Sequence, residues 1–244
     1  MKLTVVCNSD SWSDTHSSTV NFINSMAENG YDHELTSLDL RSEPFTPQLF
    51  TRFISKPVTK NYVGTTINLK DNYLDQSCSE GDFILAASLI DQILSEEIRD
   101  KFGAYGASAF YSEERKTLTF NSWDDPELKN TFDIFNNSAD YALKQLTETK
   151  ISQGKVSFFK RYLKPDTPFS QSLSDAYVRN EGRTSADITK LRTEVYNGNI
   201  ESVKQALKVI QNSLKTKEVF RVAIGNIDSI KEAIEAGYTG EMLS

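Results

Sequence analysis

Alternating apolar and polar positions predict several strands along the chain. Leu3, Val5 and Cys7 fall on one face of an extended segment, and a period of two is typical of a half-buried strand. The same alternation predicts strands over 61–69, 105–111, 117–123 and 219–225, the last with Phe220, Val222 and Ile224 on one face. Between the first two strands, residues 41–57 hold three of the six prolines, which predicts an irregular connection.

Helical spacing predicts the remaining elements. A first helix precedes Gly30, where it is expected to stop. Ser79 and Asp82 have the spacing of a capping box at the start of a long helix that ends near Gly103. Asp125, followed by a proline, is expected to be the N-cap of another helix. Apolar residues three and four apart predict helices over 128–146, 151–162, 188–195, 203–214 and 228–236.

The order of these elements predicts one large α+β domain that covers residues 1–244. No linker-like stretch or change in composition divides the series, and the first and last strands can share one sheet. We therefore expect two layers, in which helices pack mainly on one face of a largely antiparallel sheet.

Composition narrows the class of protein. Of the 244 residues, 38% are hydrophobic and 25% are charged, as in a folded globular chain. The net charge of -7 argues against a surface for nucleic acid, which needs a basic excess. Cys7 and Cys78 are too few for a disulfide framework. The longest apolar run, over 83–90, is too short to cross a membrane, and the strand-like start of the chain gives no sign of a signal peptide.

Histidine is scarce, which limits metal chemistry. The two histidines are His16 and His33. His33 is followed by Glu34, but Ser37 stands where an H-E-x-x-H motif needs its second histidine. The inverted motif H-x-x-E-H, a C-x-x-C pair, the glycine-rich phosphate loops and a G-x-S-x-G elbow are also absent from the sequence. We therefore expect no metal ligands in this chain.

The segment 98–106 joins the long helix to the predicted hairpin and carries the candidate chemistry. Gly103 is expected to be the left-handed residue after the last helical turn. Arg99 then lies in that turn and Tyr105 opens the next strand, so that a guanidinium and a phenol reach one rim of the domain. Together they offer donors for a peptide carbonyl or a developing oxyanion. A purely structural role is the alternative, because an arginine in a last turn complements the helix dipole and a tyrosine at a strand start packs on a core edge.

Several ordered motifs resemble the presequence protease branch of the pitrilysin/insulinase zinc metallopeptidases. Residues 99–106 are similar to its R-x-K-G-G-A-Y-G element, and 61–64 to its N-Y-V-G strand. The run S-W-D-D-P over 122–126 is similar to S-Y-R-D-P, and K-V-S-F-F with K-P-D, over 155–166, to K-L-S-V-F and D-x-P. The resemblance covers essentially the whole chain and is to the fourth, C-terminal domain only.

The resemblance implies a domain of a zinc endopeptidase that degrades short unstructured peptides inside a closed chamber. The N-terminal half of such enzymes carries H-x-x-E-H and binds zinc. Zinc is therefore expected in that half, and no residue of this chain is expected to bind it. Arg99 and Tyr105 match the family's substrate-binding and catalytic pair, with its six-residue separation. Phe102 departs from the pattern, because it replaces the first glycine and reduces the conformational freedom of the connection.

The resemblance also implies partners, a compartment and an alternative. The expected partners are the zinc-bearing half and peptide substrates, with no nucleic acid and no membrane insertion. Mitochondria or another organellar lumen are the expected location, and the isolated chain is expected to be inert. The alternative is a non-catalytic structural or regulatory homologue, or a separate subunit that pairs with a zinc-bearing chain.

Overall fold

The computed structural model describes residues 10–28, 51–69, 78–162, 167–180, 182–215 and 219–243. The predicted strand over 3–7 and the motif residues 164–166 lie outside the described residues. The chain divides into two compact units, one of residues 1–47 with 164–184 and one of 48–163 with 185–244. The first unit includes the helices α1 (Trp12–Glu28) and α5 (Pro168–Asn180). That residues 1–244 form one domain stays a prediction.

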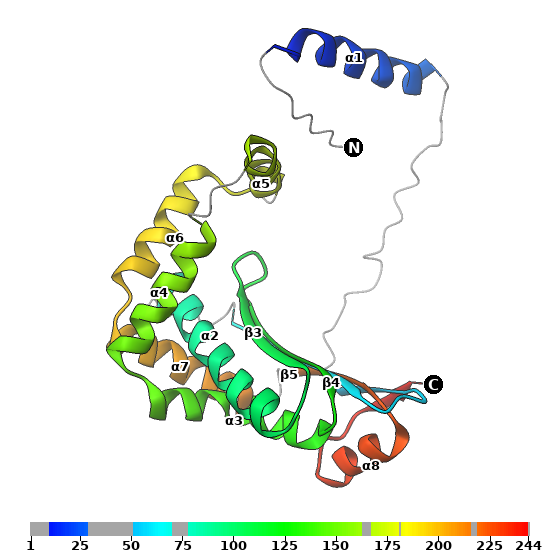
Figure 1. Ribbon diagram of the computed structural model, residues 1–244, viewed down its shortest axis with the longest axis vertical. Helices are drawn as coiled ribbons and strands as arrows, with labels where there is room; N and C mark the ends of the chain where they lie inside the picture. Colours follow the sequence, from blue (N-terminus) through cyan, green and yellow to red (C-terminus); the bar gives the residue numbers. More distant parts are fainter. Residues whose placement is uncertain are drawn as a thin grey trace, which may run out of the picture. The chain divides into compact units, whose positions relative to one another are not determined.

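A six-stranded sheet organises the second unit (Figure 1). Its strands are β1 (Thr51–Ser55), β2 (Asn61–Asn68), β3 (Gly106–Ser112), β4 (Thr117–Asp125), β5 (Val219–Gly225) and β6 (Glu241–Leu243). They are hydrogen-bonded in the order β3-β4-β2-β5-β1-β6. The pairs β3–β4, β4–β2 and β2–β5 are antiparallel, whereas β1 runs parallel to both β5 and β6. The four predicted strands that fall on described residues are confirmed.

Helices cover one face of this sheet (Figure 1). They are α2 (Glu80–Leu94), continued by the π-helical turn η2 (Ser95–Lys101), α3 (Leu128–Gln145), α4 (Glu148–Tyr162), α6 (Ser185–Asn197), α7 (Ile200–Lys215) and α8 (Ile227–Glu235). Helix α2 packs against β3, α3 and α7 both contact β2, and α8 contacts β1 and β5, whereas α4 and α6 pack on α2. The predicted α+β architecture with helices mainly on one face is confirmed. None of the helices in the described residues is long and apolar enough to cross a membrane.

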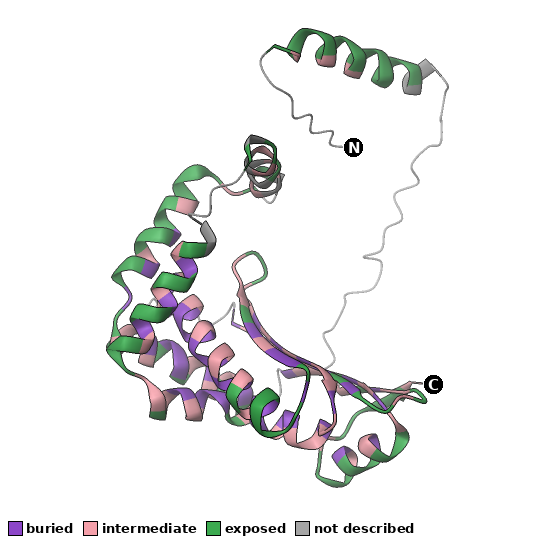
Figure 2. Cartoon of the chain, in the orientation of Figure 1, coloured by how far each residue is buried: buried purple, intermediate pink, exposed green. Residues whose placement is uncertain are grey.

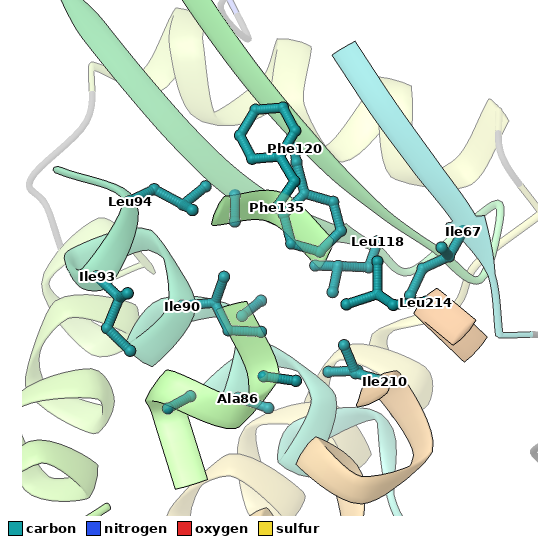
Figure 3. Close-up of a cluster of buried hydrophobic side chains, with 14 of the residues drawn as sticks. Ile67, Ala86, Ile90, Ile93, Leu94, Leu118, Phe120, Phe135, Ile210 and Leu214 are labelled. Atoms are coloured by element: carbon teal, nitrogen blue, oxygen red, sulfur yellow. The ribbon is translucent and has the colours of Figure 1, made fainter. Parts of the chain in front are cut away.

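The core lies between the sheet and these helices (Figure 2). Figure 3 shows Leu118 and Phe120 of β4 facing apolar side chains of α2, α3 and α7. Phe120 and Phe135 are in ring contact, with centroids 5.5 Å apart. The predicted capping box begins α2: the Ser79 hydroxyl accepts the Asp82 N–H, and the Asp82 carboxylate accepts the Ser79 N–H at 2.9 Å.

Two local predictions are wrong. Residues 51–55 form β1 although they lie within the proline-rich stretch predicted to be irregular, because they insert beside β5 in full register. Asp125 is not the N-cap of α3, which begins at Leu128 after Glu127. Its buried carboxylate instead accepts the Thr131 hydroxyl at 2.6 Å and the Glu127 N–H at 2.8 Å, and also accepts the Ser122 hydroxyl. Asp125 therefore fastens the end of β4 to the first turn of α3.

The face of the sheet opposite the helices keeps exposed apolar side chains. In β5, Val219 and Ala223 are buried against the helices, whereas Val222 is 43% exposed. Phe220, Val222 and Ile224 share a face as predicted, and it is this outer one. In β2 the alternation places Val63 and Ile67 in the core and leaves Tyr62 47% exposed.

Candidate functional site

The connection from η2 to β3 holds both predicted site residues. Arg99 is exposed in the last turn of η2. Its carbonyl oxygen accepts the N–H groups of Phe102 and of Gly103, the latter at 3.0 Å. Gly103 has φ 76°, the left-handed conformation that was predicted for it. These bonds satisfy the end of the helix and turn the chain sharply towards β3.

Tyr105 stands at the other end of this connection. Its backbone N–H donates to the carbonyl oxygen of Asp124 at 3.4 Å, and its side chain is 73% exposed. Ala104 before it and Gly106 after it are both buried. Within the described part of the chain, neither the Arg99 guanidinium nor the Tyr105 phenol has a hydrogen-bond or ion-pair partner. The fold therefore anchors the backbone and leaves both groups of donors directed to solvent.

Phe102 lies on the same turn and is 38% exposed. It occupies the position of the family's first glycine, and its backbone has φ -102° and ψ -1°, which a residue other than glycine can adopt. The substitution is therefore compatible with the turn. It adds an exposed aromatic ring between Arg99 and Tyr105.

A second pair, Tyr62 and Asp124, was not predicted from the sequence. The Tyr62 hydroxyl donates to Asp124 Oδ1 at 2.8 Å. This hydrogen bond to a carboxylate, together with its negative charge, raises the pKa of Tyr62 above its ordinary value of 10.0. Because Asp124 also accepts the N–H of Tyr105, the pair is next to the candidate site. Tyr62 lies in the motif over 61–64 and Asp124 in the motif over 122–126. These motifs were the sequence signal that could have pointed to the pair.

A separate groove of about 220 Å³ opens where α2, β3 and α4 meet. Asp91, Phe110, Tyr111 and Phe158 are among the residues that line it, and Arg99 and Tyr105 are not. Burial raises the pKa of the Asp91 carboxyl, and its hydrogen bond to the Ala109 N–H offsets part of that rise. Burial also raises the pKa of Tyr111.

The described residues contain no group of three or more His, Cys, Asp or Glu side chains that could hold a metal ion. The donors of the candidate site, a guanidinium and a phenol on an exposed turn, do not fit a zinc ion either. What this chain can supply at that turn is hydrogen-bond donors to an oxygen atom.

Solved structures have the same fold. The inactive domain of a peptidase M16 from Pseudomonas fluorescens superimposes with a TM-score of 0.51 at 16% identity, and the match covers 72% of this chain and 44% of that one. The inactive peptidase domain of a Bordetella parapertussis protein assigned as a zinc protease gives a TM-score of 0.52 at 10% identity, covering 69% and 94%.

Sequence comparisons are more specific. The mitochondrial presequence protease of Yarrowia lipolytica is 25% identical over 209 residues, which are 85% of this chain and 20% of that protein. The mitochondrial presequence protease of Eremothecium gossypii is 34% identical over 92 residues, or 37% of this chain and 9% of that protein. The chain thus spans a fifth or less of the length of these curated relatives. The model of the PreP C-terminal domain matches residues 51–224, well over half of the chain, and the chain belongs to this family of presequence protease domains.

Proposed function

We propose that this chain is the non-zinc C-terminal domain of a zinc metalloendopeptidase that degrades short unstructured peptides. The observation that carries the proposal is the exposed pair Arg99 and Tyr105 on one anchored turn of a PreP C-terminal domain, with the spacing of the motif that residues 99–106 resemble. The domain closes one side of a peptide chamber whose other side is the N-terminal half. Since the relatives are named mitochondrial, we place the enzyme in mitochondria.

The two side chains have complementary tasks in this proposal. The Arg99 guanidinium holds a carbonyl oxygen of the bound peptide through its planar donors. The Tyr105 phenol donates to the same oxygen as negative charge develops on it, and a fixed donor aimed at that charge lowers the barrier. Zinc, held by the N-terminal half, supplies Lewis acidity and an activated water. The isolated chain provides donors alone and is inert.

The anchoring of the turn matters for this role. A donor stabilises the developing charge best when its position is fixed before the reaction. The bonds from Gly103 to Arg99 and from Tyr105 to Asp124 fix the backbone at both ends of the connection. The open face of the sheet, with Val222 exposed, supplies apolar surface for the rest of an extended peptide.

The test is Tyr105→Phe in the chain joined to its zinc-bearing half, assayed on a quenched fluorogenic peptide. We expect kcat to fall at least tenfold, since one preorganised donor is worth about a hundredfold or more in rate. Tyr196→Phe is the matched control, because Tyr196 is a comparably exposed phenol, 70% against 73%, on α6. Unchanged kcat for Tyr105→Phe would favour a structural or regulatory domain instead.

A further inference from the structure

Strand β4 contains one residue more than its neighbour β2 at the end next to the candidate site. Asn61 pairs with Asp125 and Val63 pairs with Ser122, so the single residue Tyr62 lies opposite both Trp123 and Asp124. Two residues opposite one define a β-bulge, a feature that bends a strand and re-aims nearby groups. We refer to Trp123 and Asp124 as the bulge.

The bulge has an unusual backbone that a side chain secures. Asp124 has φ 49°, in the left-handed region, where Asp and Asn are tolerated better than most residues. The Tyr62 hydroxyl donates to its carboxylate at 2.8 Å across the strand pair. A hydrogen bond to a charged acceptor is stronger than a neutral one, so Tyr62 is well suited to hold Asp124 in this conformation.

Both residues of the bulge contact the start of β3. The carbonyl oxygen of Asp124 accepts the Tyr105 N–H at 3.4 Å. The Trp123 ring lies against Gly106, where a Cβ atom would overlap the indole. The bulge thus holds the backbone of Tyr105 and of the residue that follows it, whereas the Tyr105 hydroxyl has no hydrogen-bond partner among the described residues.

We propose that the bulge, locked by the phenol of Tyr62, positions Tyr105. Tyr62 and Asp124 act through the backbone and are positioning residues. The catalytic consequence rests on the proposed function, in which Tyr105 is a donor to the substrate. That the bulge fixes the backbone of Tyr105 does not depend on the proposed function, and it can be measured in this chain alone.

The first measurement is amide hydrogen exchange in the full chain, with the amide of Leu207 in α7 as the internal reference for global stability. We expect the Tyr105 amide to exchange about three- to tenfold faster in Tyr62→Phe and Asp124→Gly, the change typical of one lost hydrogen bond. Glycine accepts the left-handed backbone, so Asp124→Gly removes the lock without adding strain. Asp124→Asn keeps a neutral acceptor oxygen and a residue tolerated at this φ, so the Tyr105 amide is expected to exchange more slowly than in Asp124→Gly. Unchanged exchange at Tyr105 in both Tyr62→Phe and Asp124→Gly overturns the proposal.

The second measurement is a double-mutant cycle in the chain joined to its zinc-bearing half. We expect Asp124→Gly to lower kcat about three- to tenfold with little change in KM, and to have no effect when Tyr105→Phe is already present. An equal loss in both backgrounds would mean that the bulge does not act through Tyr105, and overturns the proposal. If Tyr105→Phe itself leaves kcat unchanged, the proposed function fails, and the exchange rates alone decide whether the bulge positions Tyr105.

Discussion

The carboxylate of Asp91 accepts the backbone N–H of Ala109 at 2.9 Å, so that a side chain of α2 binds the outermost strand of the sheet. Among the described residues, strand β3 has β4 on one side and no strand on the other. Unpaired edge groups invite pairing with another chain, and a side chain that occupies one of them reduces that risk. The bond is made at a cost, because burial raises the pKa of Asp91 above its ordinary value of 3.8.

Asp91→Asn is therefore expected to stabilise the chain at neutral pH. A carboxyl whose folded pKa is raised contributes stability below pH 3.8, and this contribution is lost as the pH rises through its folded pKa. Asparagine accepts the Ala109 N–H without the charge. The gain in the free energy of unfolding should grow between pH 3 and pH 7, as measured by urea denaturation. The exposed residue Asp100 provides the control, Asp100→Asn, and an equal gain at both pH values would contradict the prediction.

Asp124→Asn is expected to lower the pKa of Tyr62 towards 10.0, because it removes the negative charge beside the phenol. The pKa of Tyr62 is raised in the folded chain, so the stability gained from the pair is present below pH 10.0 and is lost as the pH rises through the folded pKa. A titration followed by the NMR signal of the Tyr62 ring carbon measures the change directly. An unchanged pKa would show that the phenol and the carboxylate are not bonded in solution.

Gly106→Ala is expected to destabilise the chain by about 1–3 kcal/mol, since the new methyl group overlaps the Trp123 ring. In a Trp123→Ala background the same substitution should cost far less. Gly103→Ala is the comparison: its Cβ atom meets nothing within 4 Å, but φ 76° makes alanine unfavourable by about 1–2 kcal/mol. That cost should be the same with or without the indole. Equal costs of Gly106→Ala in both backgrounds would disprove the close packing.

Tyr238→Phe is expected to lower the free energy of unfolding by about 0.5–1.5 kcal/mol, because it removes the hydrogen bonds of a half-buried hydroxyl group. The Tyr238 hydroxyl donates to Asp133 at 2.6 Å and accepts from Asn136 at 2.9 Å, and Asn136 in turn accepts from Arg221. Thermal unfolding measures the loss. Peptide turnover at low temperature should stay normal, since this network fastens α3 to β5 and the C-terminal segment and includes no residue of the candidate site.

Strong local signals made much of the fold predictable. Helix α2 was located by the capping box of Ser79 and Asp82, and α3 by the period of its apolar residues. Both signals depend on residues that are close in the sequence. Strand β6 has three residues and β1 five, too short for a pattern, and both depend on strands far away in the sequence. Helix α5 was also not predicted, because its few apolar residues did not suggest a helical period.

The candidate site was predictable only where its residues are close in the sequence. Arg99 and Tyr105 are six positions apart on one turn, so their spacing and the resemblance to known motifs suffice to select them. Tyr62 and Asp124 are 62 positions apart, and their contact depends on the extra residue in β4. The extra residue interrupts the alternation of buried and exposed positions in β4 only at Trp123 and Asp124, too near the end of the strand to be recognised in the sequence.

The strand order also constrains the sequence of events in folding. In the described part of the chain, strand β1 pairs with β5 and β6, and β5 separates it from β2. Strands β2, β4 and β3 can assemble early from neighbouring parts of the chain, whereas contacts between distant segments form slowly. During synthesis, β1 leaves the ribosome before β2, β3 and β4, but its partners β5 and β6 are synthesised last. Synthesis interrupted before Val219 would leave β1 without β5 and β6, the two strands that flank it in the described sheet.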